Sequence, residues 1–441
     1  MEPKAENSQP EQDEHSIVVQ RIEEDQIAQQ LDRRCTFIPI RCCDLNNKLI
    51  QTLDLTTQQV EQFKHLAKQL QAIFHAEHLS AMLSLEDLYG PLDPDDGAIE
   101  INPLDDQQRD QQVERLLDVF SGLLYSAHYK RFSQDDIESA IQLGSKWSGK
   151  IEVDFNIYDR LEIFARGYRV VEVRRRRWQN FYLEEVIQQP ELQRLIMAFR
   201  LKPQLDKKGN NKSNFDPNKV YLKTFKNIPE TDLEMLLPGT KIKLSMMDRG
   251  KILLPTLSGM AITIGKLIRG LIVLTLAITV KAIFAWIIFL GGVAGYLIKS
   301  VMGYFRTKNK FEFGLTRSLY LKNLDNNSSV LFRILHEAEE QELMEAILCY
   351  MLLWDHCRSV DCNAGLDEAA IDALAEAFLL EQTKFDIDFE IHDALGKLAR
   401  LGLLNVDPQG RWSPVKLDKS IAVLTENWEK IFRLRPLSPT P

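Results

Sequence analysis

The sequence contains few cysteines for its length, and their spacing matches no known cysteine framework. Only six occur among 441 residues. They are Cys35, Cys42, Cys43, Cys349, Cys357 and Cys362. No two are separated as in C-x-x-C, and their density is far below that of small secreted proteins held together by disulfides. The cysteines therefore exclude a disulfide scaffold and favour a reducing compartment.

The first 32 residues lack the apolar stretch of a signal peptide. They are polar, acidic and rich in Glu and Gln, which also differs from the composition of an organellar transit peptide. A segment with so few apolar residues cannot bury enough surface to fold by itself. We therefore expect a disordered acidic N-terminus over residues 1–32 and no targeting peptide.

Charge is distributed unevenly along the chain. The formal net charge is −13 for residues 1–150, +13 for residues 151–310 and −9 for residues 311–441. A basic segment between two acidic ones indicates a negatively charged neighbour. Because this segment also contains a long apolar stretch, lipid headgroups explain it better than nucleic acid, at roughly 1 kcal/mol for each Lys or Arg near the surface. We therefore predict the lipid bilayer as one partner.

Two folded regions precede the apolar stretch. In residues 33–148, stretches such as TTQQVEQFKHLAKQL place apolar residues three or four apart behind a threonine that can cap a helix. In residues 149–250 the spacing changes to alternation, as in KIEVDFNIY, with glycines between the alternating stretches. We predict an N-terminal α-helical domain followed by a basic, mostly antiparallel β-sheet domain.

The last folded region, residues 311–435, combines long amphipathic helical stretches with a short hairpin. The stretch FEIHDALGKLARLGLLNVDPQGRWSPV predicts a helix, a strand, a turn and a second strand, an order that resembles a winged helix, and residues 436–441 form a tail. Its helix offers only Lys397 and Arg400 to a nucleic acid, whereas DNA binding requires several phosphate contacts. We therefore expect a protein partner for this domain and no nucleic acid.

The apolar stretch predicts a transmembrane hairpin over residues 252–305, with arms at about 253–280 and 282–301. Basic residues flank it on both sides, and positive charge favours the cytoplasmic side, which argues for an even number of crossings. Its predicted intramembrane charges are Lys266, Arg269 and Lys281, with Lys281 at the tip of the hairpin. Earlier in the chain, a basic and aromatic cluster predicts contact with the membrane surface, although a solvated face also explains it. The cluster consists of Arg174, Arg175, Arg176, Arg177 and Trp178.

Two alternatives to the hairpin remain. One is a single span from Leu271 to Ile298, which is 28 residues long, whereas a bilayer requires about 20. It places Lys281 deep in hydrocarbon at a cost of about 3 kcal/mol. The other alternative is a re-entrant segment or one that lies on the membrane surface.

Three groups of possible metal ligands occur, and each has a simpler structural explanation. They are the pair His75 and His78, the set Cys349, His356, Cys357 and Cys362, and the acidic stretch Asp93–Gly97. The pair lacks a third ligand nearby, and the second set matches no known zinc spacing. The acidic stretch lacks the final Glu of an EF-hand. We therefore assign no catalytic, cofactor-binding or metal-ligating residue.

Five long stretches together resemble the transmembrane protein 143-like family. They are RRCTFIPIRCCDL, IEVDFNIYDRLEIFARG, FKNIPETDLEMLLPGTKIKLSMMDRGKI, LTRSLYLKNLDNN and LFRILHEAEEQEL. This resemblance covers about residues 33–432. It implies a membrane protein with a hydrophobic pair or hairpin flanked by soluble regions, and it implies no reaction.

The sequence as a whole predicts an α+β membrane protein. Its expected order is an N-terminal helical domain, a mostly antiparallel β-sheet domain, a transmembrane helical hairpin and a C-terminal helical, winged-helix-like domain. We expect an integral protein of a bacterial cytoplasmic or thylakoid-type membrane, with its soluble domains facing the cytoplasm. The expected function is a membrane-anchored scaffold or regulator. A transport or channel component, or an enzyme with a site in the N-terminal helical domain, are the alternatives.

Overall fold

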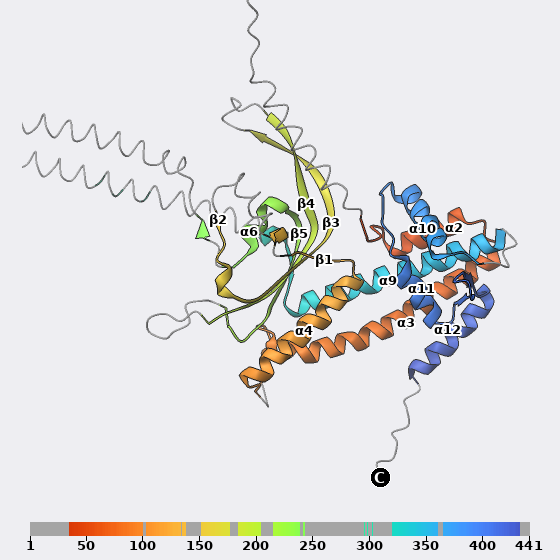
Figure 1. Ribbon diagram of the computed structural model, residues 1–441, viewed down its shortest axis with the longest axis horizontal. Helices are drawn as coiled ribbons and strands as arrows, with labels where there is room; N and C mark the ends of the chain where they lie inside the picture. Colours follow the sequence, from red (N-terminus) through yellow and green to blue (C-terminus); the bar gives the residue numbers. More distant parts are fainter. Residues whose placement is uncertain are drawn as a thin grey trace, which may run out of the picture.

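A computed structural model describes most of the chain outside the N-terminus and the apolar stretch. The described residues are 35–99, 103–133, 135–137, 151–176, 184–203, 215–238, 241–242, 295, 298, 302, 320–359 and 365–432. They form a sheet half and a helical half, and two long helices, α3 (Thr57–Tyr89) and α9 (Ser328–Ser359), run through both (Figure 1).

The remaining elements are short or confined to one half. The other helices are α2 (Cys42–Thr52), α4 (Asp106–Ser126), α6 (Leu233–Leu236), α10 (Glu368–Thr383), α11 (Ile391–Arg400) and α12 (Leu417–Phe432). The strands are β1 (Lys130–Arg131), β2 (Ile151–Glu152), β3 (Tyr158–Arg176), β4 (Glu184–Leu201), β5 (Tyr221–Pro229), β6 (Lys241–Ile242), β7 (Asn323–Asn326), β8 (Leu404–Val406) and β9 (Trp412–Pro414).

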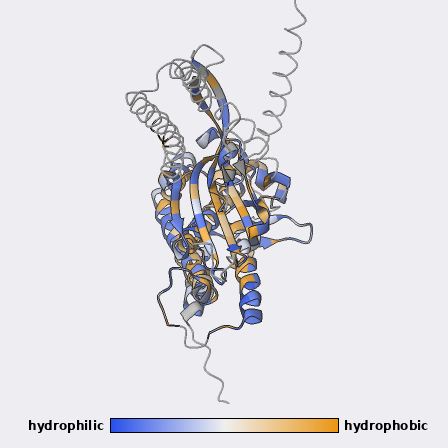
Figure 2. Ribbon diagram, turned by 90° about the vertical axis from the view of Figure 1, so that its left-hand side faces the viewer, coloured by the Kyte–Doolittle hydropathy of each residue, from blue (hydrophilic) through white to orange (hydrophobic). Residues whose placement is uncertain are grey.

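The sheet half is built on five antiparallel strands in the order β1-β3-β4-β5-β7. Side chains alternate between its faces, as strand geometry requires. Phe164 and Ile196 pack on one face against α3, α4 and α9, whereas Ile163 and Leu195 pack on the other face beside α6. Figure 2 shows apolar and polar residues alternating along the strands. Both faces of the sheet are therefore covered by apolar residues.

The alternation reverses at one level of the sheet. Leu192 and Leu195 pack on the same face although they are three residues apart, and the pairing of β4 with both of its neighbours skips Gln193. At that level β3 has Gly167 at φ +73° and β5 has Asn227 at φ 53°. A Cβ atom on Gly167 would lie 2.9 Å from the Gln193 side chain, so only glycine fits both the backbone conformation and the space.

Beyond this level, β3 and β4 extend past the rest of the sheet. Strand β1 pairs only with residues 164–165 of β3, and β5 pairs with β4 only from Glu191 onward. The outer residues, 168–176 and 184–190, form a two-stranded projection that we call the β-arm (Figure 1).

The helical half has one core. It consists of α2, the N-terminal part of α3, the C-terminal part of α9, and α10 to α12 with the β8–β9 hairpin. Helix α3 buries Leu66 in this core and Leu85 in the sheet half, and α9 buries Ile347 here and Ile334 there. Each long helix therefore has one end in each apolar core, and polar residues lie between the two ends.

The C-terminal elements follow the order predicted from their sequence. After α9, Leu366 pairs with Trp412 in an isolated antiparallel bridge, and α10, α11 and the β8–β9 hairpin come next. The hairpin turn is closed by Asp407, whose carboxylate accepts hydrogen bonds from the backbone of Gln409 and Arg411. The described residues thus show the predicted order of helix, strand, turn and strand, whereas the resemblance to a winged helix stays a prediction.

The predicted fold class, an α+β membrane protein, is corrected by the structure. The described residues form an α+β fold around the five-stranded sheet, and none of the helices in this part of the chain is both long enough and apolar enough to cross a membrane. Helices α3 and α9 have sufficient length, at 33 and 32 residues, but charged side chains recur along both, and each is costly in hydrocarbon.

The predicted integral membrane localisation is wrong for the chain that the structure describes, for the same reason. The residues predicted as the transmembrane hairpin, 252–305, lie outside the described residues apart from Gly295, Ile298 and Met302. So do the N-terminal residues 1–32, the tail 436–441, and Lys266, Arg269 and Lys281.

Candidate functional site

A polar stretch of α9, from Glu337 to Glu345, lies where the two halves meet. Within it, five glutamates and one glutamine contact the sheet, the N-terminal segment, α3 and α11. We call these residues and their partners the junction cluster. It is the densest group of buried polar side chains in the described residues, and it is therefore the candidate functional site.

The sheet half contributes Arg166 of β3, whose side chain is only 9% exposed. It forms an ion pair with Glu337 (2.8 Å) and donates a hydrogen bond to the carbonyl of Ala127 (3.0 Å). Its guanidinium lies 4.8 Å from the ring centre of Phe37 and 4.9 Å from that of Tyr129. Tyr129 also donates a hydrogen bond to Glu337 (2.7 Å), and burial, with this carboxylate beside it, raises the pKa of its phenol.

The N-terminal segment crosses the junction and is held through its backbone. The amide of Ile38 donates to the side-chain oxygen of Gln341 (2.9 Å), and the Gln341 amide donates to the Ile38 carbonyl (3.2 Å). The first amide of α2, on Cys42, donates to Glu340 (3.3 Å). Cys35 pairs with Ile387 in an isolated parallel bridge. These contacts use backbone groups of the segment, and the buried side chains of Phe37 and Ile38 add apolar contacts on the two sides of the junction.

Helices α3 and α11 meet at Glu342. His78 of α3 lies 3.7 Å from its carboxylate and Lys397 of α11 lies 3.1 Å away. Burial by itself lowers the pKa of Lys397, but Glu342 and Asp393 outweigh burial, and the net effect raises it. One turn earlier on α9, Glu339 lies 3.0 Å from His75.

The most deeply buried pair is His128 with Glu345. The two side chains are each 4% exposed, and the His128 Nε2 atom is hydrogen-bonded to Glu345 Oε1. His128 follows α4 and has φ 58°, a left-handed conformation that turns the chain into β1. Its second ring nitrogen, Nδ1, is buried and has no hydrogen-bond partner. Burial raises the pKa of Glu345, although His128 and Lys397 act in the opposite direction.

The candidate metal ligands have other partners. His75 and His78 pair with Glu339 and Glu342 on α9. Cys349 is buried, and burial raises the pKa of its thiol, whereas Cys362 lies outside the described residues. Over the described ranges, no group of three or more His, Cys, Asp or Glu is placed to hold a metal ion.

The acidic stretch Asp93–Gly97 contacts the chain at the start of α9. Ser328 donates a hydrogen bond to Asp93, and Asn327 donates to Asp95 (2.6 Å). Asn327 also accepts from the Tyr89 hydroxyl (3.3 Å). The carboxylates of this stretch therefore anchor the loop after α3 to the loop before α9.

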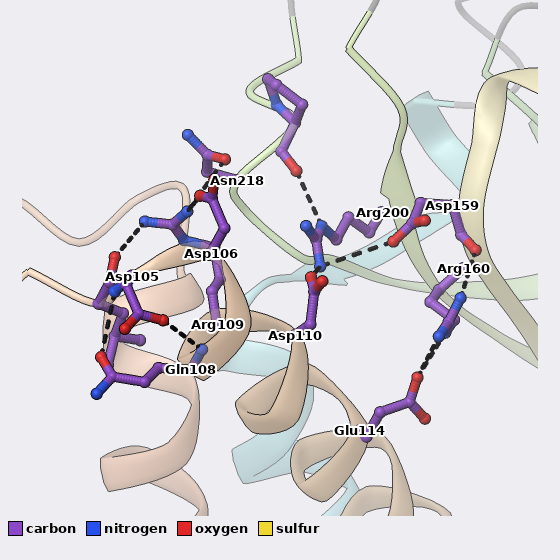
Figure 3. A network of polar contacts seen from close by, with 12 residues as sticks. Asp105, Asp106, Gln108, Arg109, Asp110, Glu114, Asp159, Arg160, Arg200 and Asn218 are labelled. Atoms are coloured by element: carbon purple, nitrogen blue, oxygen red, sulfur yellow. Dashed lines mark hydrogen bonds and ion pairs between the residues drawn. The ribbon is translucent and has the colours of Figure 1, made fainter.

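A second polar network joins α4 to the sheet (Figure 3). Arg200 of β4 lies 2.6 Å from Asp110 and 3.6 Å from Asp159, and Arg160 of β3 donates to Glu114 (2.8 Å). In the contacts of Arg200 with Asp110 and of Arg160 with Glu114, at least one side chain is well exposed to solvent. The network therefore positions the start of α4 and provides no enclosed site.

Three of the predicted membrane-surface residues, Arg174, Arg175 and Arg176, lie at the outer end of the β-arm. Arg174 is exposed, and the β3 backbone places Arg175 opposite Glu185 and Arg176 opposite Glu184. Arg177 and Trp178 lie outside the described residues. The structure therefore locates part of this cluster, and its contact with a membrane stays a prediction.

The two cations of α11 are both paired with carboxylates of this protein. Lys397 lies 3.1 Å from Glu342 and 2.9 Å from Asp393. Arg400 forms two hydrogen bonds to the carboxylate of Glu77 on α3 (2.7 and 2.9 Å). In a winged helix that reads DNA, this helix must offer cations to phosphates. Sequence analysis missed Glu342 and Glu77 as partners because each lies more than 50 residues from its cation.

Comparison with known families assigns one part of the chain. Residues 176–329 match the family described as "Protein of unknown function (DUF3754)". The match is about a third of the 441 residues and includes β4, β5 and β7 as well as the apolar stretch. It supports the coarser prediction of a domain of unknown function, and it does not name the transmembrane protein 143-like family. No solved structure matches the chain.

Proposed function

We propose that this protein is a scaffold or regulator that binds another protein through its helical half. The observation that carries the proposal is the pairing of Lys397 with Glu342 and of Arg400 with Glu77, which occupies both cations of α11 with carboxylates of this protein. The polar side chains of the junction cluster are likewise largely paired with each other. Such an arrangement favours a rigid platform over a reaction centre.

The outer face of α10 and of the segment that leads to α11 has the character of a docking surface. Residues 366–393 contain nine Asp or Glu and one Lys. Leu380 is 50% exposed and Phe385 is 60% exposed. Exposed carboxylates follow at Asp386, Asp388 and Glu390. We call these five residues the docking face, and its chemistry suits a partner that carries basic side chains around an apolar contact.

The test compares two variants of the full-length protein in affinity capture with mass spectrometry. Leu380→Asp with Phe385→Asp removes the apolar part of the docking face. The matched control is Leu79→Asp with Leu83→Asp, which adds the same two charges at exposed leucines of α3. We expect the control to retain a basic partner that the double variant loses. Identical sets of captured proteins for both variants contradict the docking face.

A second measurement separates protein binding from DNA binding. Fluorescence polarisation with a labelled duplex at low salt is expected to show no specific binding by the wild-type protein. Salt-sensitive, sequence-dependent binding contradicts the proposal, because it requires cations that the described α11 does not offer.

We also propose kinship with the transmembrane protein 143-like family, on the five stretches that resemble it. The match of residues 176–329 to a family of unknown function supports a shared domain without naming that family. This kinship assigns no reaction, in agreement with a protein-binding function.

A further inference from the structure

The pair of His128 and Glu345 lies at the deepest contact between the two halves. His128 comes from the turn between α4 and the first strand of the sheet, whereas Glu345 lies on the part of α9 that enters the helical core. Both side chains are almost fully enclosed. A change in the charge of this pair therefore changes the stability of the contact between the sheet half and the helical half.

Charged groups from every neighbouring element face the pair. They are His78 of α3, Glu342 and Cys349 of α9, Asp393, Lys397 and Arg400 of α11, and, on the sheet side, Tyr129, Arg166, Arg194 and Glu337. Glu337 is paired with Arg166 and Arg194. Lys397 acts on both Glu342 and Glu345. A proton bound at the pair therefore reduces the buried negative charge that Lys397 has to balance.

The geometry of His128 makes its protonation state matter. With one proton on Nε2, the ring donates to a charged Glu345, and an uncompensated negative charge is buried at the junction. A second proton, on the ring or on the carboxyl group, makes the pair neutral. In both states the buried Nδ1 atom has no hydrogen-bond partner, whether it carries a proton or a lone pair. The two states therefore differ in free energy mainly by the charge buried at the junction.

We propose that the His128–Glu345 pair is a proton-dependent latch between the two halves. With the additional proton bound, the pair is neutral and the halves are held together. When the proton is lost, two carboxylates, Glu342 and Glu345, share one buried cation, and the contact weakens. This device does not depend on the docking face, so either proposal can fail alone.

The sign of the pH effect follows from Glu345. Its pKa in the folded protein is raised, mainly by burial, so the folded state holds a proton that the unfolded state has released. The stabilisation that this bound proton gives to the folded state is fully present below the ordinary pKa of Glu, about 4.3. It is lost as the pH rises through the raised pKa of Glu345. The contact should therefore loosen as the pH rises.

Hydrogen exchange measured by mass spectrometry tests the latch in the full-length protein. Peptides that cover residues 127–132 and 391–401 report on the two sides of the contact. After correction for the intrinsic exchange rate, we expect their protection to fall as the pH rises from about 5 to 8, by up to tenfold per pH unit for one bound proton.

Two variants each replace one titratable group of the pair. Glu345→Gln keeps the hydrogen bond without the charge, and His128→Gln keeps a donor that cannot take up a proton. We expect both to lose most of the pH dependence, whereas His392→Gln, the same change at an exposed histidine of α11, retains it. The latch is excluded if protection in the wild type is independent of pH, or if Glu345→Gln keeps the wild-type dependence. If one variant does not fold, the other decides.

Discussion

The two halves of the molecule treat their charged residues in opposite ways. The β-arm of the sheet half presents Arg174 to solvent, whereas the helical half pairs Lys397 and Arg400 with carboxylates of its own long helices. The helical half in turn leaves Asp386, Asp388 and Glu390 exposed. The comparison teaches that the net charge of a segment does not say which of its charges can reach a partner, because tertiary pairing removes some of them.

We expect the largest loss of stability from breaking the buried ion pair between Arg166 and Glu337, which joins the two halves. Arg166→Met removes the nearer cation beside Glu337 and leaves the partly exposed Arg194, 3.8 Å away, as the counter-charge of that carboxylate. We expect a loss near the lower end of about 3 to 5 kcal/mol in the free energy of unfolding, measured by urea denaturation. Arg174→Met, the same change on the exposed β-arm, should cost little.

The double variant Arg166→Met with Glu337→Gln sharpens this result. Removing both charges should recover part of the loss, because no unpaired charge remains buried. If the double variant is as unstable as the sum of the two single ones, the pair does not join the halves in the way described.

The next largest loss of stability is expected from a substitution in the sheet half. Gly167→Ala introduces a Cβ atom at a left-handed position and against the Gln193 side chain. We expect a loss of about 1 to 3 kcal/mol. Gly122→Ala is the control, because its Cβ would meet nothing within 4 Å in α4, and alanine favours a helix by up to about 1 kcal/mol. If the two halves unfold together, the Gly167 variant also lowers hydrogen-exchange protection in α10 and α12.

A smaller effect is expected at the start of α3, in the helical half. Thr56 accepts a hydrogen bond from the amide of Gln59, and the Gln59 side chain accepts one from the amide of Thr56, which forms a capping box. Thr56→Ala should cost about 1 kcal/mol in thermal or urea unfolding. Thr57→Ala, one residue later, removes no cap and should change stability less. Equal losses for the two would argue against the cap.

The smallest effect is expected for the exposed ion pair between α11 and α3. Arg400→Gln breaks its contact with Glu77, but both side chains are partly exposed, so solvent screens the interaction. We expect a loss below about 1 kcal/mol, comparable with that of Arg411→Gln in the hairpin turn. A loss of several kcal/mol would mean that α11 is held to α3 mainly by this pair.

Much of the local structure was predictable because its causes are local. The spacing of apolar residues predicted the helices of residues 33–148 and the alternating strands of residues 149–250, and the winged-helix-like order of the C-terminal elements was visible in its turn residues. The junction cluster was not predictable. Ile38 and Gln341, which bind each other through two hydrogen bonds, are 303 residues apart in the chain, and no local pattern marks either as a partner of the other.

The error in the predicted fold class has a related cause. Hydropathy depends only on the composition of a stretch of residues. One apolar stretch therefore led to the prediction of a membrane protein for the whole chain. Helices α3 and α9 organise the described residues instead, and their apolar residues lie in two separate groups with charged residues between them. The burial of those charges depends on partners contributed by other elements, so it is a property of the assembled fold.

The sequence by itself determined most of the helices and the long strands of residues 149–250, and where several of them begin and end. The short strands β1 and β7 were not among them. These choices depend on side-chain periodicity, capping residues and glycine, all of which act within a few residues. Only the tertiary structure decided that α3 and α9 join two cores, and that the glutamates of α9 meet their cations and histidines at the junction. The physical reason is that a buried charge is stable only beside a counter-charge, and the chain brings those partners together only when it is folded.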